Sequence, residues 1–145
     1  DGDGQHNPAF LSKMANELIE SNVNMVIGSR FLEKEGFQSS FMRRVGIRYF
    51  TGLIRMLTGK KITDATSGLR MIDRNIIELF ANDYPDDYPE PETIVSLLNK
   101  GYSVKEIPVV MNERQGGVSS ISATKSVYYM IKVTLAILFV KLRGK

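Results

Sequence analysis

The chain opens on two carboxylates set among glycines, in the run Asp1-Gly2-Asp3-Gly4-Gln5-His6. Carboxylates at this spacing can bind a hard divalent cation, and such a cation can bridge the phosphates of a nucleotide. The same run is also typical of an ordinary turn, because Gly permits positive φ and Asp bonds its own backbone. A calcium-binding loop is excluded, since it requires Gly at position 6 and Glu at position 12, where this chain has His6 and Ser12. Asp1 and Asp3 are therefore candidate metal ligands.

A second candidate is a basic stripe on the helix predicted over residues 41–57. Arg44, Arg48 and Arg55 recur at spacings that place them on one helical face, with Arg43 beside them, and the stretch holds no acid. A guanidinium group suits phosphate because its planar fork donates to two oxygens. Many such stripes are only solvated faces, but four arginines without an acid favour an anionic partner.

Polar loops supply the remaining candidates. The run from Asp64 to Arg70 combines a carboxylate with the hydroxyl and backbone donors of Ser67 and Gly68, although ordinary turns often have this composition. Glu92 lies at the start of a predicted helix, where an acid is also explained by the helix dipole. The run from Asn112 to Ser120, which contains Arg114, predicts either a lid that closes over a phosphate ligand or a plain connection.

Helices and strands must alternate to position these loops. We predict helices over residues 8–19, 41–57, 74–81, 91–101 and 123–145, and strands over 23–27, 69–72 and 104–111. Pro108 places the last strand at a sheet edge or a bulge. This alternation indicates an α/β domain.

Composition narrows the classes of function. The 145 residues include no Cys, which excludes a disulfide scaffold and a Cys-based metal site. A net charge of +3 is too small to indicate a nucleic-acid partner. The apolar run 127–140 is too short to span a bilayer, but basic residues flank it, which is typical of a segment at an anionic membrane surface. A buried core helix and the start of a transmembrane segment remain alternatives.

The order of the motifs resembles the second half of family 2 glycosyltransferases of the GT-A fold. The most similar branch is that of dolichyl-phosphate mannose synthases and bacterial polyprenyl-phosphate sugar transferases. The resemblance covers nearly the whole chain and rests on Asp1 to His6, Gly28 to Phe31, Arg43-Arg44, Asp64 with Ser67 to Arg70, Glu92, and Arg114 to Ser120.

This resemblance implies a GT-A-like mixed sheet flanked by helices, of which only the C-terminal half is present. The family places a nucleotide-binding βαβ half before its acidic motif, so we expect the chain to be the C-terminal part of a longer protein. Residues 1–122 would form the acceptor-side part of the domain, and residues 123–145 an apolar, amphipathic terminal helix.

The resemblance also implies roles for the candidate residues. Asp1 and Asp3 would hold Mg²⁺ or Mn²⁺ on the diphosphate of the donor, and Gln5 and Arg30 would lie on the donor side. Asp64 and Glu92 would be the catalytic acids. The acceptor or its phosphate would be bound by Arg43, Arg44, Ser67, Gly68, Arg70 and Arg114. The run from Tyr88 to Glu92 departs from the mannose synthases, so the sugar is not carried over.

The implied reaction is a metal-dependent, inverting transfer from a nucleoside diphosphate sugar to a polyprenyl phosphate or another lipid-linked acceptor, in cell-envelope or glycan synthesis. An anionic phosphate acceptor needs no strong base, whereas a hydroxyl acceptor needs a carboxylate to take its proton. We expect a peripheral protein at the cytoplasmic face of the membrane, without a nucleic-acid partner, and leave a homo-oligomer open. The alternative function is a non-catalytic, membrane-associating or partner-binding fragment of this fold.

Overall fold

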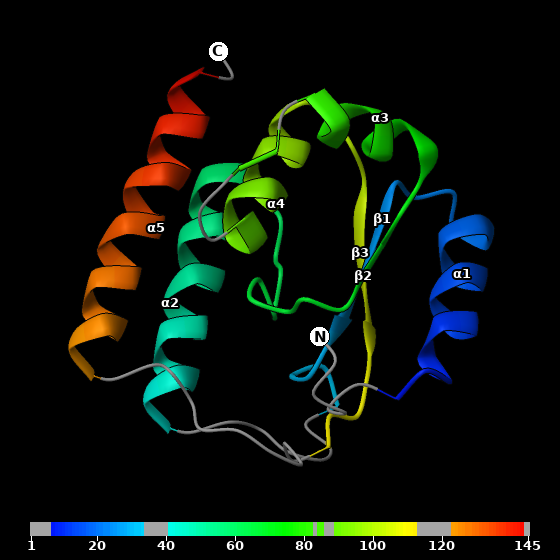
Figure 1. Ribbon diagram of the computed structural model, residues 1–145, viewed down its shortest axis with the longest axis horizontal. Helices are drawn as coiled ribbons and strands as arrows, with labels where there is room; N and C mark the ends of the chain where they lie inside the picture. Colours follow the sequence, from blue (N-terminus) through cyan, green and yellow to red (C-terminus); the bar gives the residue numbers. More distant parts are fainter. Residues whose placement is uncertain (1–6, 34–40, 83, 86–88, 113–122, 144–145) are drawn as a thin grey trace.

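The computed structural model describes residues 7–33, 41–82, 84–85, 89–112 and 123–143 (Figure 1). Five helices and a small mixed sheet of three strands occur in these ranges, which confirms the predicted α/β class. Their order along the chain is α1 (Phe10–Glu20), β1 (Met25–Ser29), α2 (Phe41–Thr58), β2 (Arg70–Ile72), α3 (Arg74–Asn82), α4 (Pro89–Asn99), β3 (Val104–Pro108) and α5 (Ala123–Arg143).

The sheet is arranged around β1, in the order β2-β1-β3. β1 runs antiparallel to β2 and parallel to β3, so that Met25 lies opposite both Ile72 and Val104. All five residues of β1 are buried, as is usual for a central strand. Among the described strands β3 is at an edge, which is the position that Pro108 predicts.

Helices cover both faces of the sheet (Figure 1). Because successive side chains of a strand point to opposite faces, Val26 packs with Met14 of α1 on one side, while Met25 and Ile27 face the larger core on the other. Most of the other buried residues of that larger core come from α2, α4 and α5, and they include Phe50, Ile54, Ile94, Leu97, Val133 and Ile137.

A local signal explains the end of α2, whereas contacts with distant residues accompany the start of β1. α2 matches the predicted range to within one residue and ends before Gly59, whose φ of 72° suits the left-handed position after a helix. α4 begins at Pro89, two residues earlier than predicted. β1 begins two residues later than predicted, because Asn24 is bound to Asp73 and Ser103 at the strand's entry.

α5 agrees in part with one alternative predicted for the terminal segment, a buried core helix. Val133 and Ile137 are buried against α4 and α2, whereas Ile131, Leu135 and Leu142 are each more than half exposed. Within the described ranges, no helix has the length and apolar character needed to cross a bilayer.

Candidate functional site

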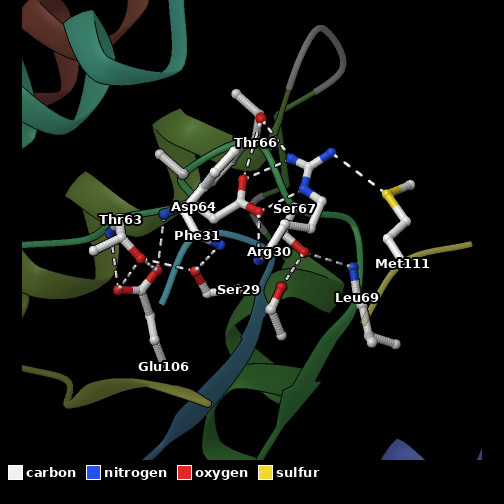
Figure 2. A network of polar contacts seen from close by, with 12 residues as sticks. Ser29, Arg30, Phe31, Thr63, Asp64, Thr66, Ser67, Leu69, Glu106 and Met111 are labelled. Carbon is white, nitrogen blue, oxygen red and sulfur yellow. Dashed lines mark hydrogen bonds and ion pairs between the residues drawn. The ribbon is translucent and has the colours of Figure 1, made fainter. Parts of the chain in front are cut away.

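A buried ion pair lies at the carboxyl end of β1, the edge of a parallel pairing at which α/β proteins bind ligands. Arg30 directly follows β1, and its guanidinium binds Asp64 through Nε–Oδ2 and Nη2–Oδ1 contacts of 2.6 Å each (Figure 2). The Arg30 backbone N–H also donates to Oδ2, at 3.1 Å. The side chains are only 4% and 0% exposed. This two-pronged, charge-assisted geometry fixes both side chains in one arrangement.

The segment after Asp64 wraps around the end of β1. Thr66 Oγ1 accepts a hydrogen bond from Arg30 Nη2 at 3.1 Å, and Ser67 Oγ donates to the carbonyl oxygen of Gly28 at 2.7 Å. Gly28 permits this close approach, because a Cβ atom there would lie 2.9 Å from Leu69 Cδ2 and a neighbouring side chain would have to shift. The loop and the strand are therefore in direct contact.

Arg70 anchors the other end of this loop. Its Nε donates to the Ser67 carbonyl oxygen at 2.8 Å, and its Nη2 donates to those of Ala65 and Glu90, at 3.1 and 2.8 Å. Its Nη1 donates to Thr93 Oγ1 at 2.8 Å. Burial lowers the pKa of Arg70 to about 10, which still leaves it charged at neutral pH. Arg70 thus ties the loop to the first turn of α4.

Glu106 was not among the candidates from the sequence, yet it belongs to the same network. Both of its carboxylate oxygens accept from the Thr63 N–H, at 2.9 and 2.8 Å, and from Thr63 Oγ1, at 3.0 Å. Oε1 also accepts from the Asp64 N–H at 2.8 Å. Burial raises the pKa of Glu106, and the negative charge of Asp64 adds to the rise. The sequence does contain a signal that could have identified Glu106, namely an acid within an otherwise largely apolar predicted strand.

The structure joins some of the predicted residues and places others apart. Arg30, Asp64, Ser67 and Arg70 share one network, and Gly68 is an exposed residue of the same loop. Glu92 lies half-buried in the first turn of α4, the turn that Arg70 contacts. Arg44 is exposed on α2.

Several predicted residues cannot be placed. Asp1, Asp3, Gln5 and Arg114 lie outside the described residues, as does the side chain of Arg43. In the part of the chain that the structure does describe, no group of three or more His, Asp and Glu side chains could hold a metal ion. The predicted ligands Asp1 and Asp3 lie outside that part of the chain.

A second surface lies on α2 and α5, which lie side by side (Figure 1). Tyr49 of α2 and Thr134 of α5 are hydrogen-bonded through their side chains at 3.1 Å. Neither helix contains an acid. We call the exposed large apolar side chains of the two helices the α2–α5 surface; they are Phe41, Val45, Tyr49, Met56, Val127, Tyr128, Ile131, Leu135, Leu138, Phe139 and Leu142.

Comparison with known proteins gives one family and several distant relatives. The sequence pattern of glycosyl transferase family 2 matches residues 1–80. The chain is 30% identical, over 137 residues, to a polyprenol monophosphomannose synthase of Mycolicibacterium smegmatis, an alignment that covers 92% of this chain and 51% of the relative. It is 24% identical, over 112 residues, to a UDP-N-acetylglucosamine–dolichyl-phosphate N-acetylglucosaminyltransferase of Methanococcus voltae, covering 75% and 45%. The chain thus spans about half the length of these curated relatives. No solved structure matches significantly.

Proposed function

Because the chain belongs to glycosyl transferase family 2, we propose that it takes part in transferring a sugar from a nucleoside diphosphate sugar to a polyprenyl phosphate. The names of both relatives include the phosphate of a polyprenol or dolichol, which supports this acceptor class. Their names differ in the sugar, so we assign none. The observation that carries the proposal is the buried Arg30–Asp64 pair, which fixes the end of β1 within the residues that match the family.

The proposed reaction is a single displacement, in which the acceptor oxygen attacks the anomeric carbon opposite the departing diphosphate and inverts its configuration. A divalent cation, Mg²⁺ or Mn²⁺, would neutralise charge on that diphosphate, and we propose that Asp1 and Asp3 hold it. Arg30 would lie on the donor side. A phosphate acceptor is already anionic, so positioning matters more than a base.

The contacts of Asp64 favour a holding role over proton transfer. Both carboxylate oxygens already accept hydrogen bonds from the guanidinium of Arg30. We therefore propose that Asp64 orients Arg30. Glu92, in the first turn of α4, remains the candidate base if the acceptor presents a hydroxyl instead.

Transfer to a polyprenyl phosphate is tested most directly with the protein expressed from its intact gene. Labelled nucleoside diphosphate sugars are supplied with a polyprenyl phosphate, and label is measured in the lipid extract. We expect transfer in Mg²⁺ or Mn²⁺, and its loss in EDTA or after Asp3→Ala. Glu78→Ala is the control, because Glu78 is an exposed acid distant in sequence from the acidic motif. Transfer that persists in EDTA would refute metal dependence.

We further propose that the α2–α5 surface rests on the cytoplasmic face of the membrane, where such an acceptor would be reached. Its exposed apolar side chains can enter the lipid boundary, and the exposed Arg44, Arg48 and Arg55 can bind anionic headgroups. The alternative, a non-catalytic fragment that only binds membranes or a partner, predicts vesicle binding without any sugar transfer.

Vesicle flotation tests the membrane contact. Ile131→Asn in α5 should weaken binding to vesicles with anionic lipid about tenfold or more, since burial of such a side chain contributes about 1.5–3 kcal/mol. Ile77→Asn is the matched control, because Ile77 is similarly exposed, at 53% against 58%, but lies on α3. Equal binding of both variants would contradict the proposal. If Ile131→Asn instead dissociates a dimer, the surface joins two copies of the chain.

A further inference from the structure

Two hydroxyl groups form a chain between the backbone after β1 and the carboxylate of Glu106 (Figure 2). The N–H of Phe31 donates to Ser29 Oγ at 3.3 Å, and Ser29 Oγ lies 2.7 Å from Thr63 Oγ1. An ionised carboxylate only accepts, so the single hydroxyl proton of Thr63 points to Glu106. Thr63 Oγ1 must then accept from Ser29. The charge of Glu106 thus sets the direction of the whole chain.

This chain reaches Arg30 from its backbone side. Its first two members, Phe31 and Ser29, are the residues on either side of Arg30. A second connection reaches the guanidinium, because Glu106 Oε1 holds the N–H of Asp64 while the Asp64 carboxylate holds Arg30. Glu106 is therefore connected both to the backbone beside Arg30 and to its guanidinium, in each case through intervening residues.

We propose that Glu106 is a positioning residue that orients Arg30 through Thr63 and Asp64. The part of this role that concerns the donor phosphates rests on the proposed function, whereas the orientation of Arg30 does not. Glu106→Gln would not reproduce it. The Gln side chain carries an NH2 group where Glu has its second oxygen. This NH2 group would face the Thr63 and Asp64 N–H groups or the Thr63 hydroxyl, so that donor would meet donor.

The charge balance of the network favours a role beyond stability. In this largely buried site Glu106 accepts its hydrogen bonds from neutral donors of Thr63 and Asp64, and the nearby charge of Asp64 adds to the rise of its pKa. A buried charge without a full counter-charge costs stability, and neutral groups could join the same strands and loop at lower cost. An acid here is better explained by the orientation that it imposes.

The most specific test uses Thr63, because two substitutions distinguish the effect of losing its hydroxyl group from the effect of changing its shape. Thr63→Val breaks the hydroxyl chain but leaves the N–H groups of residues 63 and 64 bound to Glu106. Thr63→Ser keeps the hydroxyl. Glu106→Gln alters both connections, and Glu78→Gln is the control on an exposed acid.

The first measurement does not depend on any activity. In nitrogen-15 NMR spectra of the folded protein, we expect Thr63→Val and Glu106→Gln to shift the Arg30 Nε–H signal. They should also speed hydrogen exchange at the Phe31 N–H about tenfold, the scale of one hydrogen bond linked to a charged group. Thr63→Ser and Glu78→Gln should leave both values as in the unsubstituted protein. An unchanged Arg30 signal in folded Thr63→Val overturns the inference, whatever the activity.

The second measurement is sugar transfer by the protein expressed from its intact gene. Thr63→Val should raise the KM for the donor about tenfold with a smaller change in kcat, and Thr63→Ser should restore it. A purely structural role would lower the melting temperature of Thr63→Val without moving this KM, and would overturn the link to the donor. If the unsubstituted protein transfers no sugar, the proposed function fails, and the NMR measurement alone decides the orientation of Arg30.

Discussion

Replacement of Asp64 by Asn is the most informative change to the site, because it removes one charge of the buried pair and keeps its shape. The variant therefore leaves the Arg30 guanidinium, whose side chain is 4% exposed, without the carboxylate that balances its charge. Loss of one partner from a buried pair costs about 3–5 kcal/mol. For a chain of this size, each kcal/mol corresponds to roughly 2–4 °C, so the melting temperature should fall by about 6–20 °C.

The measurement is denaturant unfolding followed by circular dichroism, with a second pair as control. Arg74 and Glu78 form a contact of 2.9 Å whose side chains are 88% and 65% exposed. Glu78→Gln should cost only about 0.3–0.5 kcal/mol, as for exposed pairs one helical turn apart. The double variant Arg30→Met with Asp64→Leu should recover most of the loss, because apolar groups can replace both charges at little cost. A loss below about 1 kcal/mol for Asp64→Asn would refute the argument.

Three further predictions concern the surroundings of this pair. Gly28→Ala should cost about 1–3 kcal/mol in thermal unfolding, because its Cβ would lie 2.9 Å from Leu69, whereas Gly52→Ala, in open space on α2, should add about 0.5–1 kcal/mol; equal effects would contradict the packing argument. Arg70→Lys should lower the free energy of unfolding, measured in urea, by about 1–3 kcal/mol, since one ammonium cannot reach all the acceptors of the guanidinium. An unchanged free energy of unfolding would count against the anchoring role. The raised pKa of Glu106 means that its contribution to stability is full below its ordinary value of 4.5 and is lost as pH rises. The melting temperature relative to Glu106→Gln should therefore fall as pH rises above 4.5, and a rise would contradict the sign.

Elements with strong local signals could be predicted from the sequence. α2 has an amphipathic pattern and a glycine stop, and its predicted range differs by a single residue. The predicted start of β1 is two residues early, because Val23 fits the alternating apolar pattern and local pattern does not show where pairing starts. That start is set by contacts of Asn24 with residues far along the chain.

The partners within the site could not be predicted in the same way. Residue type indicates which bonds Arg30 and Asp64 can form, but not that two residues 34 positions apart bind each other. Arg70 was predicted to bind phosphate, and the structure shows its donors directed at carbonyl oxygens and a hydroxyl. The sequence marks Glu106 only as an acid in a largely apolar strand, and its place opposite buried Ile27 follows from the pairing of β3 with β1.

The topology of the sheet has a consequence for the order in which the chain folds. The parallel pairing of β1 with β3 joins residues 79 positions apart, as between Met25 and Val104, whereas Arg30 and Asp64 are separated by 34. Closing the longer loop costs about 0.7 kcal/mol more in chain entropy. We therefore expect the ion pair to form before β3 docks, and pulsed hydrogen exchange should protect the Thr63 N–H later than the amides of α2. In that sequence of events, the site reaches its final geometry only in the last step of folding, when the strand that carries Glu106 joins the sheet.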